Sequence, residues 1–501
     1  MPGTENDGGE KKPVEVGEEL TGTSDVQGTT SMDKLSTTAR KASAVIYSGL
    51  RKAVITPQIL FLIIASILGL TLVFLNPMFH VADEPAHFWK AYSVGELHLL
   101  SVREKGIEGN ELPLSIQKTM ETVKFQVADG LKIDEKAVDQ GFRIPLNSGK
   151  KGFMANGVAG LYPPVPYIPQ AVGIDIGRIF NESPLTLAYM GRAFNLLAWL
   201  ILVFLAISIT PVFKWVFFLL GVMPMAMLQA ASLSPDSVTN GLAFLTVAFF
   251  LRLAFAKDKR RVTKRDIVLM FVLGVLLAFV KQPYFLLVFL FLLIPRSKFK
   301  SKKEYYVVFA ALVLIVLVIG MSWTMMESSA YTPPHPDVVS GKQVSFILHH
   351  PYTAAVILLR TINVYKEGWL SGFVGAFDWF ETALPMWIAY LFLFALIGTA
   401  VLDKDKDIEI RNSKKLLMLV IAVAMFLGVV AALYLSWTPV GYFLIQGVQG
   451  RYLIPLAPLI LLLFYNRAVS YDKGKAFYAL MVAIPVLTTY FTISRIWHRF
   501  Y

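Results

Sequence analysis

The chain of 501 residues contains no cysteine. This absence excludes disulfide bridges, thioether-linked haem and zinc sites with cysteine ligands. Charged residues are also few, at 16% of the chain, whereas hydrophobic residues make up 55% and the mean hydropathy is +0.57. A water-soluble globular protein does not have this composition, so we expect an integral membrane protein.

Two motifs that would suggest other chemistry are incomplete. No phosphate-binding loop of the form G-x-x-x-x-G-K-[ST] accompanies "DEPAH" at residues 83–87, which argues against a nucleotide-driven helicase. Glu84 and His87 form a Glu-x-x-His motif, but a di-iron site needs a second one. The net charge of +12 does not predict nucleic-acid binding, because Lys and Arg gather in short loops between apolar runs.

Hydropathy predicts about eleven membrane-spanning helices, because a span needs roughly 20 apolar residues and must pair its backbone groups internally. The expected fold class is therefore all-α, a polytopic transmembrane helical bundle. The run around Lys281 is interrupted at Pro283 and is either one broken helix or two half-length spans. The predicted spans are residues 57–77, 185–209, 213–233, 238–256, 266–280, 284–295, 305–325, 385–402, 415–437, 452–465 and 476–493.

The distribution of basic residues predicts the orientation. Four loops rich in Lys or Arg fall on one side if the eleven spans alternate, and cytoplasmic loops carry such an excess. The N-terminus is then inside and the C-terminus outside, with two long extracytoplasmic loops at residues 78–184 and 326–384, the first of which should contain short helices. The four basic loops are residues 256–265, 296–304, 403–415 and 465–475.

The segment before the first span divides into two parts. Residues 1–42 have hardly any apolar side chains and predict a disordered cytoplasmic tail. Residues 43–56 continue a helical spacing of apolar positions with basic residues between them. This juxtamembrane segment is either an amphipathic helix on the inner leaflet or an extension of the first span. The remaining residues, 57–501, form the predicted transmembrane domain.

An acidic doublet and a histidine follow the first predicted span, in "NPMFHVADEPAHFWKAYSVGEL" at residues 76–97. They would be the first charged groups on the outer face. Asp83 or Glu84 could simply cap a helix that begins near Pro85. A carboxylate beside a membrane-embedded cavity could also act as a general base.

Four further polar clusters lie at the predicted outer ends of spans. Charged side chains at membrane depth usually face the bundle interior or a water-filled cavity, although a lone lysine can also reach out to the interface. We expect these clusters and the acidic doublet to converge on one cavity that suits an anionic lipid head group. They are Tyr162 in "YPPVPYIPQ" with Arg192, Asp236 in "ASLSPDSVTN", Lys281 in "FVKQPYF", and Arg451 with Gln446 and Gln449 in "IQGVQGRYLIPLAPL".

Five successive stretches resemble the signatures of a bacterial membrane-protein family, domain of unknown function 2142. They are "ADEPAHFWKAYSVGELHL", "YPPVPYIPQAVGIDIGR" with "YMGRAFNLL", "AASLSPDSVTNGL", "FVGAFDWFETALPMW" and "GVQGRYLIPLAPL". The resemblance covers about residues 57–465. That family in turn resembles the GT-C superfamily of glycosyltransferases, which use lipid phosphate-linked sugars outside the cytoplasm.

The GT-C resemblance implies a role for each residue of the doublet. Asp83 would be the general base that takes the proton of an acceptor hydroxyl. Glu84 would orient the acceptor or hold a divalent cation. From position and charge alone, Lys281, Arg451 and Arg192 are the candidates to bind the polyprenyl phosphate of the donor. The remaining candidates for substrate contact are His87, Tyr162, Asp236, Gln446, Gln449 and Asp378.

The second predicted outer loop is less informative. "SFILHHPYTAAVILLRTINVY" predicts an interfacial helix, and His349 and His350 within it lack a carboxylate at metal-ligand spacing. Asp378 in "GAFDWFE" could meet an acceptor glycan, but an aromatic belt at the membrane boundary has the same composition.

These observations predict a membrane glycosyltransferase in the lipid bilayer of the cell membrane. It would move a sugar from a polyprenyl-phosphate donor to a cell-envelope glycan or a lipid-linked acceptor on the extracytoplasmic face. Two alternatives stay open: a transporter or flippase for a lipid-linked saccharide, which the broken helix near Pro283 would suit, and a non-catalytic scaffold that binds lipid carriers.

Overall fold

The computed structural model describes most of the chain from Thr56 onward, and these residues form one compact unit. The predicted tail at residues 1–42 and all but the last residue of the predicted segment 43–56 lie outside the described part. The described residues are 56–123, 132–155, 159–160, 162–257, 260–328, 331, 333, 335–378, 381–466, 469 and 473–501.

The fold is mostly helical. Its α-helices are α2 (Pro57–Leu75), α3 (Glu84–Gly95), α4 (Leu114–Thr122), α5 (Glu135–Phe142), α6 (Ile168–Ile179), α7 (Pro184–Ile209), α8 (Lys214–Gly221), α9 (Pro224–Ala230), α10 (Asp236–Phe255), α11 (Lys264–Ala278), α12 (Lys302–Ser328), α13 (Ser340–His349), α14 (Pro351–Val374), α15 (Met386–Leu402), α16 (Asn412–Ser436), α17 (Ala457–Leu462) and α18 (Lys475–Phe500). Four 3-10 helices are described, η2 (Val165–Tyr167), η3 (Gln282–Leu293), η4 (Arg296–Lys298) and η5 (Gly450–Leu456), and five strands, β1 (Val102–Glu104), β2 (Ile107–Pro113), β3 (Lys151–Ala155), β4 (Ala376–Phe377) and β5 (Thr382–Ala383).

Six of the described helices are long and apolar enough to cross a membrane, namely α2, α7, α10, α12, α16 and α18. Helix α2 illustrates why: it begins at Pro57, none of its nineteen residues is charged, and it ends before Asn76 and Pro77. The other five predicted spans coincide with shorter elements. The structure therefore supports a multi-helix membrane protein with six candidate spans by length.

Prolines divide two of the shorter runs. Pro224 begins α9, so the predicted span 213–233 consists of the two short helices α8 and α9. The run around Pro283 is two separate elements, because α11 ends at Ala278 and η3 starts at Gln282. An interrupted backbone at membrane depth must be received by protein or by a polar cavity. Lys281 lies at this interruption.

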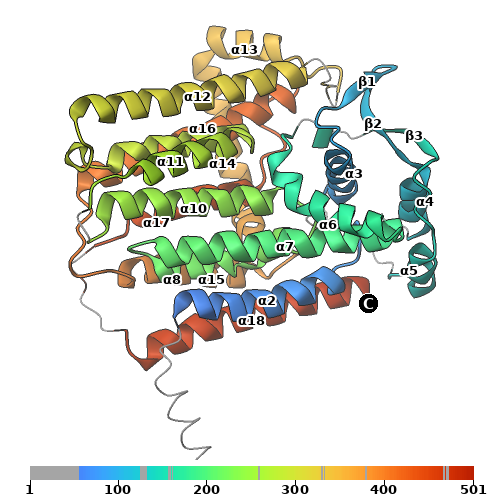
Figure 1. Ribbon diagram of the computed structural model, residues 1–501, viewed down its shortest axis with the longest axis horizontal. Helices are drawn as coiled ribbons and strands as arrows, with labels where there is room; N and C mark the ends of the chain where they lie inside the picture. The colour runs from blue at the N-terminus through green and yellow to red at the C-terminus, as the bar shows by residue number, and fades with distance from the viewer. Residues whose placement is uncertain are drawn as a thin grey trace, which may run out of the picture. The chain divides into compact units, whose positions relative to one another are not determined.

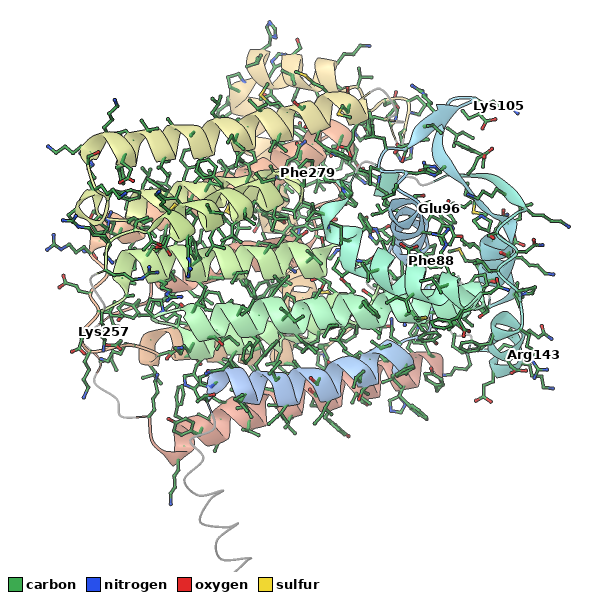
Figure 2. The ribbon with its side chains drawn as sticks, viewed as in Figure 1. Phe88, Glu96, Lys105, Arg143, Lys257 and Phe279 are labelled. Atoms are coloured by element: carbon green, nitrogen blue, oxygen red, sulfur yellow. The ribbon has the colours of Figure 1, made fainter. Side chains whose placement is uncertain are left out.

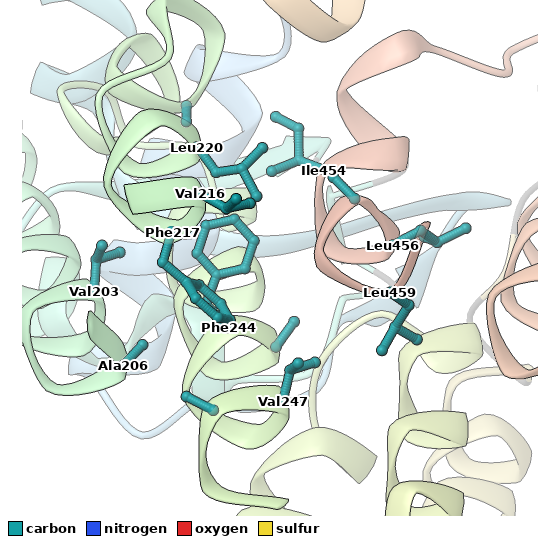
Figure 3. Close-up of a cluster of buried hydrophobic side chains, with 14 of the residues drawn as sticks. Val203, Ala206, Val216, Phe217, Leu220, Phe244, Val247, Ile454, Leu456 and Leu459 are labelled. Atoms are coloured by element: carbon teal, nitrogen blue, oxygen red, sulfur yellow. The ribbon is translucent and has the colours of Figure 1, made fainter. Parts of the chain in front are cut away.

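The long helices run side by side, in the order α18, α2, α7, α10, α11 and α12 (Figure 1). Apolar side chains fill the space between them. Figure 3 shows a part of this core in which Val203 of α7, Phe217 of α8 and Phe244 of α10 lie to one side and Leu459 of α17 to the other. Within a bilayer such close packing, and not the exclusion of water, holds helices together.

The described residues of the four basic loops lie together at one end of the bundle. Val262 N donates to Lys298 O at 2.8 Å, and Lys257 Nζ lies 2.9 Å from Asp405 Oδ1. Lys473 Nζ lies 2.6 Å from Asp403 Oδ1. Figure 2 shows Lys257 at this end, opposite the end that carries Glu96 and Arg143. The prediction that these loops share one side is confirmed.

The segment between α2 and α7 contains the expected short helices, α3 to α6, but also an antiparallel sheet in the order β1-β2-β3. The expectation of an all-α fold is therefore wrong in this respect. Lys105 and Gly106, with φ of 50° and 84°, form the two-residue turn between β1 and β2. Two positive φ values suit the right-handed twist of a hairpin. The Lys-Gly pair is a weaker turn signal than Asn-Gly.

The second predicted outer loop forms two helices instead of one. Helix α13 ends at His349 and α14 begins at Pro351, because a proline cannot continue the preceding helix. Both carry exposed apolar side chains, such as Leu348 and Leu359. A two-stranded hairpin, β4 with β5, follows and contains Asp378.

A buried ion pair fixes the entry to α3. Arg192 Nε donates to Glu84 Oε1 at 2.7 Å and Arg192 Nη2 donates to Glu84 Oε2 at 2.5 Å, and both side chains are fully buried. The remaining N–H groups of Arg192 donate to the carbonyls of Val73, Asn76 and Pro77 at the end of α2. All five guanidinium donors are thus used.

We predict that Arg192→Met lowers the free energy of unfolding by about 3–5 kcal/mol, because it leaves Glu84 buried without its counter-charge. The double variant Arg192→Met/Glu84→Gln should lose less than the sum of the two single variants. Thermal unfolding in detergent micelles measures both. The control is Arg143→Gln, whose ion pair with Asp139 is exposed and should contribute little. Equal losses for Arg192→Met and Arg143→Gln would contradict the prediction.

Candidate functional site

Asp236 lies between two cations at the end of the bundle opposite the basic loops. Lys281 Nζ is 2.5 Å from Asp236 Oδ1, and Arg451 Nε is 3.5 Å from Asp236 Oδ2. Asp236 is the first residue of α10, where the helix dipole favours a negative charge. All three side chains are at most 15% exposed, so their interactions are screened little by solvent.

Two buried amides orient the Asp236 carboxylate. Gln229 Nε2 donates to Asp236 Oδ2 at 3.0 Å, and Asn240 Nδ2 donates to Gln229 Oε1 at 3.0 Å. Gln229 belongs to α9 and Asn240 to the second turn of α10. A carboxylate whose oxygens accept from a cation and an amide has little freedom to rotate.

Asp83 connects this network to the surface. Arg451 Nη2 donates to Asp83 Oδ2 at 3.2 Å, and the Asp83 side chain is 33% exposed. Asp83 precedes α3 but makes no capping hydrogen bond, so the capping role predicted for it is not present. Its backbone is left-handed, with φ of 65°. Aspartate tolerates this region better than most residues, and such conformations concentrate at functional sites.

Arg451 owes its position to a close approach of two backbones. It is the second residue of η5, which packs on the C-terminal part of α14. A Cβ at Gly450 would collide with the carbonyl oxygen of Trp369 on α14. Glycine at position 450, directly before Arg451, is what lets the two backbones approach this closely. A side chain at residue 450 would move Arg451 away from Asp83.

The aromatic rings of Tyr162 and Tyr452 lie beside the ammonium group of Lys281. Lys281 Nζ lies 4.0 Å from the ring centroid of Tyr452 and 5.2 Å from that of Tyr162. The hydroxyl of Tyr284 donates to Tyr452 O at 2.9 Å and fixes the backbone beside Arg451. Aromatic faces attract cations by their quadrupole, most strongly where water is excluded. The ammonium of Lys281 is thus held by a carboxylate and two rings.

His87 extends the network along α3, one turn after Asp83. Its Nδ1 is 2.9 Å from the hydroxyl of Tyr167, and its ring lies 6.0 Å from that of Tyr162. Burial lowers the pKa of His87 to about 4, and the carboxylate of Asp83 acts in the opposite direction. Burial raises the pKa of Tyr167 well above its ordinary value. Both groups are therefore neutral near pH 7.

The structure brings together six of the residues that the sequence analysis singled out. Two carboxylates and two cations alternate, so the network has no net charge while histidine and tyrosines remain neutral. The residues come from five segments far apart in the chain, and they are Asp83, His87, Tyr162, Asp236, Lys281 and Arg451.

The structure assigns Glu84 and Arg192 another role. Glu84 accepts from Arg192, from Phe79 N at 2.9 Å and from Leu233 N at 3.1 Å, and it is fully buried. The predicted contacts of Glu84 with an acceptor and of Arg192 with a phosphate would each require this buried pair to open. Neither side chain has surface or hydrogen-bonding capacity to offer a substrate.

Three other predicted residues lie apart from the network's contacts. Asp378 is 3.3 Å from Arg499 Nε of α18 and is only 4% exposed. The backbone N of Gln446 donates to Thr438 Oγ1, and the buried Oε1 of Gln449 has no hydrogen-bond partner among the described residues. Substrate contact by Gln446 and Gln449 stays a prediction. Asp378 has a structural ion pair where a sugar contact was expected.

Sequence reasoning missed Gln229, Tyr167 and Tyr452. The sequence could have indicated Gln229 as a site residue, since it is a polar residue within the apolar run 213–233. Tyr452 follows Arg451 directly, and Tyr167 lies in the same proline-rich stretch as Tyr162. Nothing in the sequence indicates that these tyrosines meet Lys281 and His87, because the contacts join distant segments.

The donor set does not fit the divalent cation considered for the doublet. Among the described residues, no group of three or more His, Asp or Glu side chains is arranged to hold a metal ion. The two carboxylates of the network, Asp83 and Asp236, both contact Arg451. An arginine between two carboxylates occupies the space that a metal ion would need.

The buried state of His87 predicts a pH dependence of stability. Its pKa is about 4 in the folded protein against an ordinary value of 6.5, so folding loses stability as the pH falls through this window, by about 3 kcal/mol in all. Thermal midpoints at pH 7 and pH 4.5 should differ less for His87→Gln than for the wild type. The exposed His349→Gln is the control and should behave as wild type. An unchanged profile in His87→Gln would contradict the prediction.

Comparison with known proteins places the chain in a family. A family model described as "Predicted membrane protein (DUF2142)" matches residues 66–460. No curated protein and no solved structure matches the chain. The match begins within α2, ends within α17 and includes every residue of the charge network. The chain therefore belongs to this family of predicted membrane proteins, domain of unknown function 2142.

Proposed function

We propose that this protein is a membrane glycosyltransferase that uses a polyprenyl-phosphate sugar at the charge network around Asp83. The observation that carries the proposal is the contrast within the acidic doublet. Glu84 is fully buried and saturated, whereas Asp83 is 33% exposed, beside two buried cations. A partly exposed carboxylate next to fixed positive charges is what transfer from a phosphate-linked donor requires.

The proposed topology has eleven crossings, with the N-terminus in the cytoplasm and the network at the extracytoplasmic end. It is supported by the clustering of the four basic loops at the end remote from the network. Cytoplasmic loops carry the excess of Lys and Arg. The lipid-linked donor and the cell-envelope acceptor would then both reach the network from the outer leaflet.

In the proposed reaction the acceptor hydroxyl attacks the anomeric carbon of the donor sugar. Its proton passes to the Asp83 carboxylate, and the bond between the anomeric carbon and the phosphate oxygen breaks. The electron pair stays on the polyprenyl phosphate, whose added negative charge Lys281 and Arg451 offset. A single displacement of this kind inverts the anomeric centre.

Lys281 and Arg451 are suited to binding a phosphate because Asp236 fixes both of them and Arg451 also contacts the partly exposed Asp83. Asp236 balances Lys281 and Arg451 in the absence of donor and prevents their mutual repulsion. A donor phosphate would replace the partly exposed Asp83 as a partner of Arg451, so the displaced carboxylate stays within reach of water and no uncompensated charge is buried. The flanking rings of Tyr162 and Tyr452 offer apolar faces on which a sugar can stack.

A lipid-linked saccharide transporter is the second candidate. It is favoured by the interruption between α11 and η3, where Lys281 lies, because transporters bind substrates at discontinuous helices. Vesicles that contain the protein and a fluorescent lipid-linked sugar distinguish the two. Transfer yields a new glycosidic bond, whereas transport moves the lipid between leaflets without one.

We predict that Asp83→Asn lowers sugar transfer by about 10²–10⁴-fold while the protein folds normally. Asparagine is the suitable substitution because it is isosteric and also tolerates the left-handed backbone. The matched control is Glu84→Gln in the neighbouring position, which should lower thermal stability instead. Radiolabelled sugar incorporation by purified protein in liposomes measures the first effect, and thermal unfolding the second. Full transfer by Asp83→Asn would remove the proposed role.

A further inference from the structure

Helix α6 carries apolar side chains on its exposed face and a polar side chain on its buried face. Ile168, Val172 and Ile179 are 47%, 44% and 79% exposed. Gln170 is fully buried, and its Nε2 donates to Ser234 O at 3.3 Å. A helix at a water-exposed surface has the opposite arrangement, with its apolar stripe turned towards the core. The reversed arrangement is typical of a helix that faces lipid on its outer side.

Helix α5, in the same segment between α2 and α7, has the ordinary arrangement. Its exposed residues include Glu135, Lys136, Asp139 and Gln140, whereas Ala137 is buried. Both helices pack on α7. The contrast therefore indicates different surroundings for the two outer faces, since the helices share the element that they pack against.

Helix α6 packs on α7 in the manner of a membrane helix (Figure 1). A Cβ at Gly173 would collide with the carbonyl oxygen of Met190, and a Cβ at Gly177 would collide with the side chain of Leu187. Small residues four positions apart let two helices approach closely, and this is how helices associate in lipid. As the residue number rises along α6 it falls along α7, so the helices are antiparallel and α6 lies along the first part of α7.

The turn between α6 and α7 lies at the end of the bundle remote from the basic loops. Arg178, in the last turn of α6, is 3.1 Å from Glu96 Oε1, and Figure 2 shows Glu96 at that end. Helix α7 is one of the candidate spans, and its 26 residues extend over about 39 Å. A bilayer with its head groups is about 40–45 Å thick. The turn therefore falls in the head-group region.

The side chains of α6 fit this depth. Its charged residues are near the turn, where Arg178 Nη1 donates to Asp175 Oδ1 at 2.8 Å. The first half of the helix contains no charged residue. Val172 and Ile168 precede Ile179 by seven and eleven residues, so they lie about 10 to 17 Å further along the helix, at the level of the acyl chains.

The exposed face of α6 continues an apolar stripe on α7. Leu197, Ile201 and Leu205 are each 40–50% exposed and follow one another at helical spacing. Phe194, one turn before Leu197, lies against Gly173 of α6. Because α7 is a candidate span, its exposed apolar stripe is the surface that meets lipid. The outer face of α6 extends this surface.

We propose that α6 is embedded in the leaflet remote from the basic loops, with Ile168 and Val172 against the acyl chains. The partner of this surface is the apolar part of the membrane lipid. Helix α6 enters the leaflet beside α7 but does not cross the bilayer, since its twelve residues extend over about 18 Å. Hydropathy alone assigns these residues to an aqueous loop.

The embedded helix leads to the charge network. Tyr167 directly precedes α6 and contacts His87 at 2.9 Å. Tyr162 lies five residues earlier, with its ring 5.2 Å from Lys281 Nζ. A ligand carried by the membrane would then reach the network by diffusion within the leaflet. This consequence for a lipid-linked donor rests on the proposed function, whereas the placement of α6 does not.

Fluorescence quenching in liposomes tests the placement. The chain has no cysteine, so single-cysteine variants of the full-length protein can be labelled with bimane at one site. The test variants are Ile168→Cys and Val172→Cys, reconstituted into lipid that carries bromine on its acyl chains. Leu197→Cys on α7 is the reference for contact with lipid, and Gln140→Cys on the exposed face of α5 is the matched control in water. We expect both test variants to lose as much fluorescence as Leu197→Cys and Gln140→Cys to lose little.

Lipids with a nitroxide at a chosen depth give the orientation of α6. A head-group nitroxide should quench bimane at Ile179→Cys more strongly, and a nitroxide deep in the acyl chain should quench bimane at Ile168→Cys more strongly. All the substituted side chains are exposed, so the variants should fold, and thermal unfolding before labelling checks this.

Ile168→Cys and Val172→Cys that stay as bright as Gln140→Cys in brominated lipid would overturn the proposal. This holds whether water or a second copy of the chain covers the face, and disulfide formation between copies at these cysteines would identify the second copy. The measurement uses no sugar donor. Failure of the glycosyltransferase proposal therefore leaves its outcome unchanged.

Discussion

The bidentate pair between Arg192 and Glu84 is the interaction on which the site end of the bundle depends. Arg192 binds three carbonyls at the end of α2, and Glu84 binds the backbone N–H groups of Phe79 and Leu233. A buried ion pair adds little net stability compared with apolar packing, but loss of one partner is costly. Its contribution is therefore geometric: it determines how the chain turns from α2 into α3. Asp83 is left partly exposed because its neighbour takes the buried position.

The charge network follows from this arrangement. Asp236, oriented by Gln229, keeps Lys281 and Arg451 close together at a depth where unpaired cations would be costly. Arg451 also reaches Asp83, so the exposed carboxylate is connected to the buried one through a single guanidinium. Substitution of one member therefore alters the electrostatic interactions of the others, since a low local dielectric strengthens each contact. Under the proposed function, this coupling would transmit the arrival of a phosphate at the cations to the general base.

The sequence predicts the helical membrane class, the common side of the basic loops and the convergence of six site residues. These depend on hydropathy, charge bias and the cost of burying a charge, all of which can be read residue by residue. It could not separate Asp83 from Glu84, because adjacent carboxylates look alike until Arg192 is seen to saturate one of them. The pairing of Asp378 with Arg499, and the sheet that joins β2 to β3, are contacts between distant segments. No local pattern encodes such contacts.

The tight winding of η3 has a consequence for how the chain uses its length. A 3-10 helix rises by about 2.0 Å per residue against about 1.5 Å for an α-helix. The twelve residues Gln282–Leu293 therefore extend over roughly 24 Å, a distance for which an α-helix would need about sixteen residues. A segment that looks too brief to traverse a hydrocarbon layer thus comes close to doing so, while its narrower cylinder leaves more room for the side chains packed around it.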